Sequence, residues 1–402
     1  MAQTGINIKV ADTVLGSPPS VNANTMMFVQ YARGVDNGRQ PPFDLNTPYK
    51  LRSLADLEAM GVLYNGNEAL YTAVRDFYYP NKDVDNTGTI LWVVGWEHGF
   101  GATMDDDPAL ANKIVAHVIS TTIKSFSDRP RTLVWFNPDA SPANFGAPVL
   151  SDAISRLRSE GIYVVGLIGL AMGSEYDFGA IIGETDTLLE DDGYPFVGWN
   201  PFFHKDISLN LQPTVAMVAG LLASVSVGTS IGDMSLPPIG EDIMFETQQR
   251  SVKTLTSSEL MELGGAQVIF ARTRPPRNGL WWNDGATLND TQNALSTLEA
   301  VRTLCSVVDD LRLFFTNYIN TRVPVAANGD IDPTYKQVVL DNARAKVITP
   351  YIESGDISDA RIELVAKNNN MVSTRTWEVK VSILPAPTLR WIDGFVFYVN
   401  SL

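Results

Sequence analysis

Near its start the chain alternates apolar and polar residues with the two-residue period of a β-strand, and near its end a short apolar run predicts a second terminal strand. A stretch that contains Pro18 and Pro19 follows the first of these segments. A strand on such a tether has no neighbouring strand in the sequence, so it needs the edge of a sheet elsewhere, in its own chain or in another one. The residues that would pair are Ile6, Ile8 and Val10 near the start, and Phe395, Phe397 and Val399 near the end.

In the first quarter of the chain, short apolar segments are separated by amphipathic helices. The run Met26–Tyr31 predicts a buried strand, and Thr89–Trp96 predicts another because it is apolar and rich in residues that favour strands. Ser53 is a favourable N-cap for a helix over 54–60, and a second amphipathic helix follows it.

The middle of the chain has a strand–helix–strand order. Residues 133–136 predict a short strand, residues 149–159 a helix, and residues 162–168 a continuously apolar strand. That order predicts a parallel sheet covered by helices. The next predicted elements are a helix over 213–227, a helix over 257–263, a strand over 267–272 and a loop over 274–283.

The C-terminal region has the most regular periodicity. Asp290 is predicted to cap a long helix whose apolar residues recur at steps of three and four. The pair Asp332–Pro333 has the favoured order for opening another helix, which is predicted to continue to near Tyr351. Two alternating segments, 361–367 and 376–384, then predict strands.

Composition indicates a globular protein of two or three domains, since 45% of its 402 residues are hydrophobic and 19% are charged. A net charge of −15 repels phosphates and disfavours direct binding to nucleic acid. The start lacks the features of a signal peptide, and the longest apolar stretch falls short of the roughly 20 residues that a membrane span needs. We therefore expect a soluble protein that is made and assembled in the cytoplasm.

Residues with catalytic or metal-binding chemistry form no recognisable motif. His98, His117 and His204 lack the spacing of metal ligands, so we expect ordinary loop or core histidines. The single cysteine, Cys305, lies in an amphipathic helical pattern and is expected to be a buried thiol. These observations predict a protein without enzymatic activity, cofactor or metal.

The residues leave two other functions open. A carbohydrate-active enzyme could use a pair of carboxylates, with Trp281 and Trp282 stacked on sugar rings, although adjacent aspartates are more often solvated. A ligand-binding α/β protein would require a formed pocket within residues 131–200. The acidic clusters are Asp105–Asp107, Asp191–Asp192 and Asp309–Asp310.

The order of segments resembles the tail sheath family of contractile phages, pyocins and related injection systems. The similarity spans nearly the whole chain, with the region 101–210 adding little. Two places depart from the family pattern: Leu57 stands where a phenylalanine is frequent, and the segment 301–304 has only Arg302 where the family usually has a pair of arginines. The segments that resemble the family are 28–34, 50–57, 70–78, 89–94, 213–223, 255–263, 266–270, 332–334, 379–387 and 395–399.

This resemblance implies a structural subunit that polymerises as stacked hexameric rings around an inner tube and contracts to drive the tube through a target envelope. The implied partners are further copies of the chain, the inner tail tube protein, and baseplate and tail terminator proteins, without direct nucleic-acid contact or membrane insertion. The implied location is a virion tail or a bacterial contractile injection particle. A tube subunit fits less well, because tube subunits are usually much shorter and mostly β.

The implied fold is α/β, in the sense of several mixed α+β domains. The sheath core is built from N- and C-terminal segments, and a β-α-β outer domain is inserted between them. The expected division is an N-terminal arm over 1–24, a first core segment over 25–100, the inserted outer domain over 101–236, a second core segment over 237–385 and a C-terminal arm over 386–402.

The resemblance also implies roles for particular residues. The two terminal segments would be strands donated to neighbouring subunits, although pairing within their own subunit is the other possibility. The receiving sheet would contain Ile362, Leu364, Trp377, Val379, Val381 and Ile383. Lys336, Arg344 and Lys346 would contact the inner tube, unless they form an ordinary solvated face.

Overall fold

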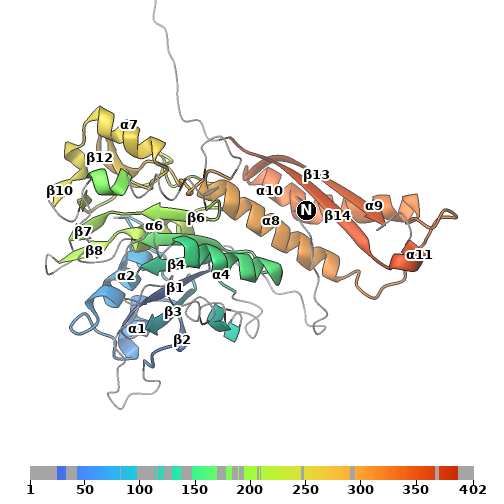
Figure 1. Ribbon diagram of the computed structural model, residues 1–402, viewed down its shortest axis with the longest axis horizontal. Coiled ribbons are helices and arrows are strands. Elements are labelled where there is room, and N and C mark those ends of the chain that lie inside the picture. Colours follow the sequence, from blue (N-terminus) through green and yellow to red (C-terminus); the bar gives the residue numbers. More distant parts are fainter. Residues whose placement is uncertain are drawn as a thin grey trace, which may run out of the picture.

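A wide α/β lobe and a narrower C-terminal lobe are joined by one long helix in the computed structural model (Figure 1). The expected α/β class is confirmed, with helices and several sheets. The structure describes residues 25–32, 43–81, 83–96, 113, 116–118, 120–121, 129–136, 147–169, 178–182, 189, 194–205, 208, 210–245, 249–289, 295–366 and 371–387. The predicted terminal strands therefore lie outside the described residues.

A six-stranded sheet in the order β2-β3-β1-β4-β5-β6 forms the centre of the wide lobe. All neighbouring strands are parallel except β2, which runs antiparallel to β3. The continuous apolar runs of the sequence become strands that are buried on both faces, as parallel strands require. The strands are β1 (Met26–Tyr31), β2 (Pro48–Leu51), β3 (Leu91–Trp96), β4 (Thr132–Phe136), β5 (Val165–Gly169) and β6 (Val197–Asn200).

Helices α1 (Leu54–Ala59), α2 (Glu68–Tyr78), α4 (Ala147–Ser159) and α6 (Val215–Ser224) pack in this lobe. The predicted cap of α1 is confirmed, since Ser53 and Asp56 form a capping box. Helix α6 approaches α2 so closely that a Cβ atom on Gly220 would collide with the backbone of Phe77. Asn86 joins the two helices, because its Nδ2 donates to the carbonyls of Phe77 and Gly220 at 2.8 and 2.7 Å.

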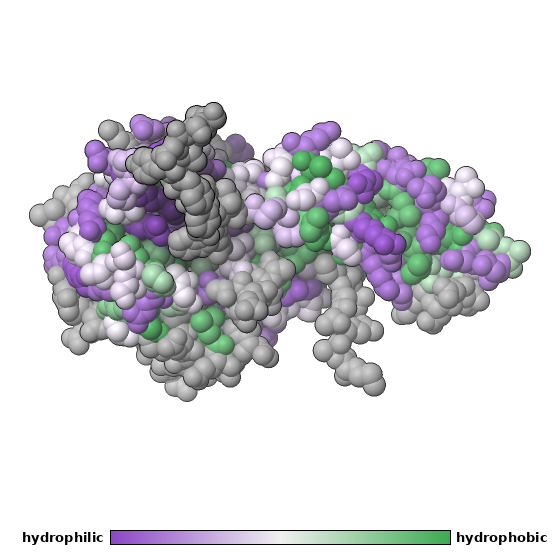
Figure 2. Space-filling model, turned by 90° about the horizontal axis from the view of Figure 1, so that it is seen from above, coloured by the Kyte–Doolittle hydropathy of each residue, from purple (hydrophilic) through white to green (hydrophobic). Residues whose placement is uncertain are grey.

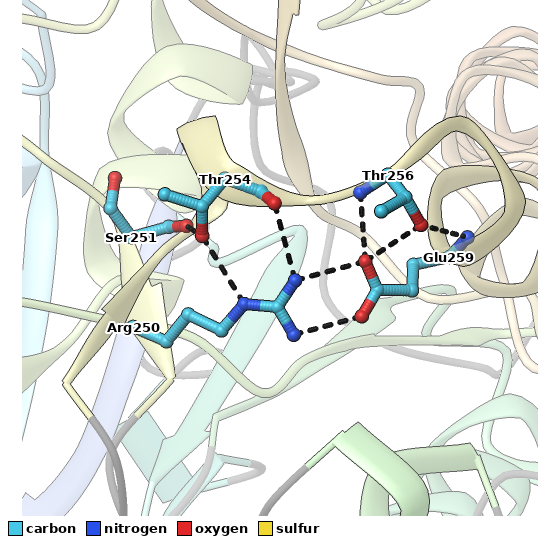
Figure 3. A network of polar contacts seen from close by, with 5 residues as sticks. All are labelled: Arg250, Ser251, Thr254, Thr256 and Glu259. Atoms are coloured by element: carbon cyan, nitrogen blue, oxygen red, sulfur yellow. Dashed lines mark hydrogen bonds and ion pairs between the residues drawn. The ribbon is translucent and has the colours of Figure 1, made fainter.

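Smaller sheets complete the wide lobe beside α7 (Ser257–Gly265). A four-stranded sheet has the order β10-β9-β7-β8, and β11 and β12 form a hairpin. Figure 3 shows how this region is fastened: Arg250 forms two hydrogen bonds with Glu259, whose carboxylate also completes the capping box of α7 with Thr256. The elements are β7 (Phe203–Lys205), β8 (Leu211–Pro213), β9 (Met244–Phe245), β10 (Arg250–Ser251), η3 (Val252–Thr254), β11 (Ala271–Arg274) and β12 (Arg277–Trp282).

The predicted loop over 274–283 is wrong, because most of it is strand β12. Pro275 and Pro276 form the turn of the β11–β12 hairpin, where proline is compatible with the backbone. Strand β11 correspondingly begins at Ala271, later than the predicted start at residue 267. The density of proline and glycine in this segment thus marked a turn, and the apolar residues after the turn formed a strand.

The narrower lobe consists of a helical layer and the β13–β14 hairpin (Figure 1). Helix α8 begins at Leu298 with Thr297 as its cap, so the prediction that Asp290 caps this helix is wrong. The N-cap at Asp332 is confirmed, and its carboxylate accepts from the backbone of Thr334 and Tyr335. The elements are α8 (Leu298–Thr316), α9 (Pro333–Ala343), the π-helical segment η4 (Arg344–Ile348), α10 (Thr349–Glu353), β13 (Ile357–Ala366), α11 (Met371–Thr374) and β14 (Trp377–Pro385).

Pro350 explains the π-helical segment between α9 and α10. Proline has no backbone N–H and its ring clashes with the carbonyl four residues earlier, here that of Lys346. The segment instead forms wider turns, in which the Thr349 N–H donates to the Arg344 carbonyl. Residues 333–353 therefore form the predicted helix, with a local irregularity at its centre.

The hydrophobic core consists of two clusters that meet at α8. One cluster runs from Met26 to Val308, and the other from Val307 to Ala366. Strands from both sides of the expected 100/101 domain boundary belong to the same six-stranded sheet, so these two segments share the first cluster. No helix within the described ranges combines the length and apolar character needed to cross a membrane.

A buried histidine links α2 to β7. The His204 side chain is fully buried, its Nε2 lies 2.7 Å from Asp76 Oδ2, and its Nδ1 lies 3.3 Å from the Lys205 carbonyl. Burial lowers the pKa of His204, and the nearby charge of Arg75 lowers it a little further. The charge and hydrogen bond of Asp76 together outweigh these effects, so the pKa is raised above 6.5. Both ring nitrogens face acceptors, which favours the imidazolium.

We expect the contribution of His204 to stability to disappear at alkaline pH. Because the folded pKa exceeds the unfolded one, the contribution is complete below about pH 6.5 and is lost as the pH rises through the folded value. Urea unfolding at several pH values should therefore show a difference between the wild type and His204→Gln that shrinks as the pH rises. A difference independent of pH would show that the histidine is neutral in the folded protein.

Candidate inter-subunit surface

The β13–β14 hairpin has one apolar and one charged face. In its register, Ile362 lies opposite Val381 and Leu364 opposite Val379, so the side chains of each pair share a face. The six residues predicted for the receiving sheet all lie on this face and pack against the second core cluster. On the other face Glu363 lies opposite Lys380.

Aromatic rings hold the hairpin on the helices beneath it. Trp377 of β14 has its ring centroid 5.6 Å from that of Tyr318 and 6.4 Å from those of Phe315 and Tyr335. Phe315 belongs to α8 and Tyr335 to α9, so one indole contacts both helices. These contacts fix the orientation of the hairpin, because large rings bury much surface and lose few rotamers.

Both outer edges of the hairpin are open within the described residues, where β13 and β14 pair only with each other. An isolated two-stranded sheet is marginally stable, and its unpaired N–H and C=O groups can bond a further strand. Figure 2 shows apolar surface between polar residues on this narrower lobe, and the exposed apolar residues include Val338, Val372 and Leu384. The lobe thus offers sheet edges and apolar patches to a partner.

The three cations predicted to contact a tube have different environments. Arg344 is engaged by its own chain: Nη2 donates to Asp359 Oδ1 and Nη1 to the Ala360 carbonyl, both at 2.8 Å. The hydrogen bond from Arg344, followed by that from the Ala360 N–H, lowers the pKa of Asp359. Lys336 is half-buried on α9 and Lys346 is exposed on η4.

The adjacent carboxylates of Asp309 and Asp310 on α8 bond residues of the wide lobe and of the narrower lobe, respectively. Asp309 is fully buried and forms ion pairs with Arg129, at 2.5 Å, and with Arg131, both from the wide lobe. Asp310 accepts a hydrogen bond from Tyr351 of α10 at 2.6 Å. Burial raises the pKa of Asp310, and the Tyr351 hydrogen bond opposes that shift. Sequence reasoning missed this joint, because the arginines are far away in the chain.

The described residues that the sequence suggested for other functions are buried in the core. Trp281 and Trp282 are 6% and 1% exposed, so they offer no stacking surface for a sugar. Cys305 is buried as predicted, and burial raises the pKa of its thiol to about 12, which keeps it protonated and unreactive. The described residues contain no cluster of three potential metal ligands. His204 is a hydrogen-bonded core histidine, whereas His98 lies outside the described residues.

Comparison with solved structures finds the same architecture over the whole chain. The contracted helical sheath of the anti-feeding prophage matches with a TM-score of 0.63 and 13% identity, covering 100% of both chains. The sheath of the PVC extracellular contractile injection system, also contracted, matches with a TM-score of 0.61 and 13% identity, covering 100% of this chain and 98% of that one. This chain has the fold of a contractile sheath protein.

The sheath fold also includes a sheath tail protein from Listeria innocua, which matches with a TM-score of 0.54 and 12% identity over 94% of each chain. Neither a family model nor a curated protein sequence matched the chain. The likeness therefore lies in the fold, at a sequence identity where only the order of elements and scattered motifs persist. That order is what the resemblance in the sequence was based on, and the expected sheath fold is confirmed.

Proposed function

We propose that the chain is a structural, non-enzymatic subunit that polymerises as hexameric rings stacked around an inner tube and contracts to drive that tube through a target envelope. The main support is the match in fold to contracted sheaths, with an alignment that covers 100% of this chain. Such a subunit works by changing its contacts with other copies, and it needs no nucleotide or metal.

Strand exchange would hold the copies together. The hairpin of β13 and β14 supplies two open edges on a firmly packed support. The donated strands would be those of Ile6, Ile8 and Val10, which alternate with polar residues, and of Phe395, Phe397 and Val399, which lie in a short apolar run. The 17 residues after Pro385 can span up to roughly 56–61 Å when extended.

Such a connection suits a contractile lattice. Backbone hydrogen bonds made by donated terminal strands can persist while the subunit bodies move past one another. Head-to-tail contacts that do not close into a ring continue as a helix, which gives a cylinder of stacked rings. The energy would come from metastable packing that is released when contraction increases the contact area.

The proposed partners are the inner tube protein, baseplate and tail terminator proteins, in a virion tail or a bacterial injection particle assembled in the cytoplasm. Lys336 and Lys346 remain candidates for the tube contact, whereas Arg344 would have to leave Asp359 to reach a tube. The net charge of −15 supports the absence of direct nucleic-acid binding. Contact with a baseplate is supported by a fold match to the anti-feeding prophage baseplate structure, with a TM-score of 0.62.

Assembly of the purified full-length chain tests the proposal. Size-exclusion chromatography followed by negative-stain electron microscopy should show rings or striated tubes whose amount rises with protein concentration. Raising the salt concentration should preserve them if backbone pairing holds the copies, because screening weakens mainly charge contacts. A compact monomer at every concentration, with uptake of a small ligand, would favour the ligand-binding alternative.

A further inference from the structure

The backbone of Ala360 on β13 is bonded by side chains of its own chain. Its N–H donates to Asp359 Oδ1 at 2.8 Å, and its carbonyl accepts from Arg344 Nη1 at 2.8 Å. Arg344 Nη2 also donates to Asp359 Oδ1 at 2.8 Å. The three hydrogen bonds close a ring around the two polar groups of a single strand residue.

These hydrogen bonds show which residues of β13 direct their backbone N–H and C=O groups toward the open edge. In an antiparallel pair a residue directs its N–H and C=O to the same side, and successive residues alternate between sides. Ala360 lies opposite Ile383, yet side chains hold both of its polar groups, so these groups face the open edge. By the same alternation, the polar groups of Ile362 and Leu364 face that edge too.

The Arg344–Asp359 pair reproduces the bonds that an added strand would make. A strand pairing with Ala360 would offer one C=O as acceptor and one N–H as donor. The Asp359 carboxylate occupies the place of that acceptor, and the Arg344 guanidinium occupies the place of that donor. Among the residues that the structure describes, no side chain makes such bonds to Ile362 or Leu364.

We propose that Arg344 and Asp359 cap the edge of β13 and end its strand-addition site at Ala360, so that a terminal strand of a second copy pairs along residues 362–366 only. The inference rests on the strand exchange proposed above. Pairing at Ala360 would replace its two hydrogen bonds to Arg344 and Asp359 by two hydrogen bonds to the added strand. It would also separate the Arg344–Asp359 ion pair, so no binding free energy is gained there. Pairing at Ile362 and Leu364 forms bonds that the free subunit lacks. Charged side chains at sheet edges commonly limit pairing in this way.

Residue-resolved amide hydrogen exchange on the full-length chain, free and assembled, tests the cap. The test variant is Asp359→Ala, and the matched control is Glu363→Ala, which removes an exposed carboxylate paired with Arg361 on the same strand. In the free wild type the Ala360 amide should exchange about two- to tenfold more slowly than those of Ile362 and Leu364, because it alone is hydrogen-bonded. Asp359→Ala should abolish this difference, and the control should retain it.

Assembly should slow exchange at Ile362 and Leu364 by at least about tenfold in all three proteins. It should leave Ala360 unchanged in the wild type and the control, and slow it in Asp359→Ala. If Ala360 gains as much protection as Ile362 in the assembled wild type, or gains none in Asp359→Ala, the cap is wrong and the strand exchange stands. If tubes form without protection at any of these amides, strand addition to β13 is wrong as well. If no tubes form, the proposed function itself fails.

Discussion

Replacing Asp309 with asparagine is expected to lower the free energy of unfolding by about 3–5 kcal/mol, the usual cost of breaking a buried ion pair by removing one partner. The substitution keeps the size of the side chain and removes only its charge. Arg131, which is 4% exposed, and Arg129, whose side chain is 17% exposed, would then lose the carboxylate that pairs with both of them. Burial already lowers the pKa of Arg129 even with Asp309 beside it, which indicates how poorly the site tolerates an isolated cation.

Urea unfolding followed by tryptophan fluorescence measures this effect. Asp152→Asn is the matched control, because Asp152 pairs with Arg156 on the surface of α4, with both side chains nearly half exposed. An exposed pair of this kind contributes at most about 0.5 kcal/mol, so the control should unfold almost as the wild type does. A loss below about 1 kcal/mol in Asp309→Asn would mean that the lobes are held by apolar contacts alone.

Deleting residues 1–20 is expected to abolish tube formation and to leave a folded monomer. The deletion removes Ile6, Ile8 and Val10 and leaves every described strand and helix of the chain in place. If the donated strand links the copies, its loss removes a whole row of backbone hydrogen bonds at each junction, an effect far larger than that of any single side chain. Electron microscopy measures the loss of tubes, and circular dichroism with urea unfolding measures retention of the fold.

The matched control for the deletion is the double substitution Asn7→Ser and Lys9→Ser. It changes the polar face of the predicted strand and keeps the apolar face, so tubes should persist. Long sheaths formed by the deleted chain would refute the assignment of the N-terminal arm. An unfolded deleted chain would instead indicate that the first residues pair within their own subunit.

Local signals in the sequence predicted most elements correctly. Ser53 and Asp332 were identified as helix caps because the cap and the backbone groups that it bonds lie within three residues of each other. The apolar face of β13–β14 followed from the alternation of apolar and polar residues, since a strand places every second side chain on the same side. The start of α8 was predicted wrongly, since Thr297 and not Asp290 caps the helix, whose first residue Leu298 is buried.

The sequence by itself thus determined the order of elements, the apolar face of the hairpin and the resemblance to contractile sheaths, because each depends on residues close together in the chain. Only the tertiary structure decided the environment of charged and aromatic residues. Asp309 meets Arg129 across 180 positions, Trp281 and Trp282 face inward, and Arg344 reaches the edge of β13. No periodic pattern encodes such contacts, because the partner of a charge depends on how distant segments pack.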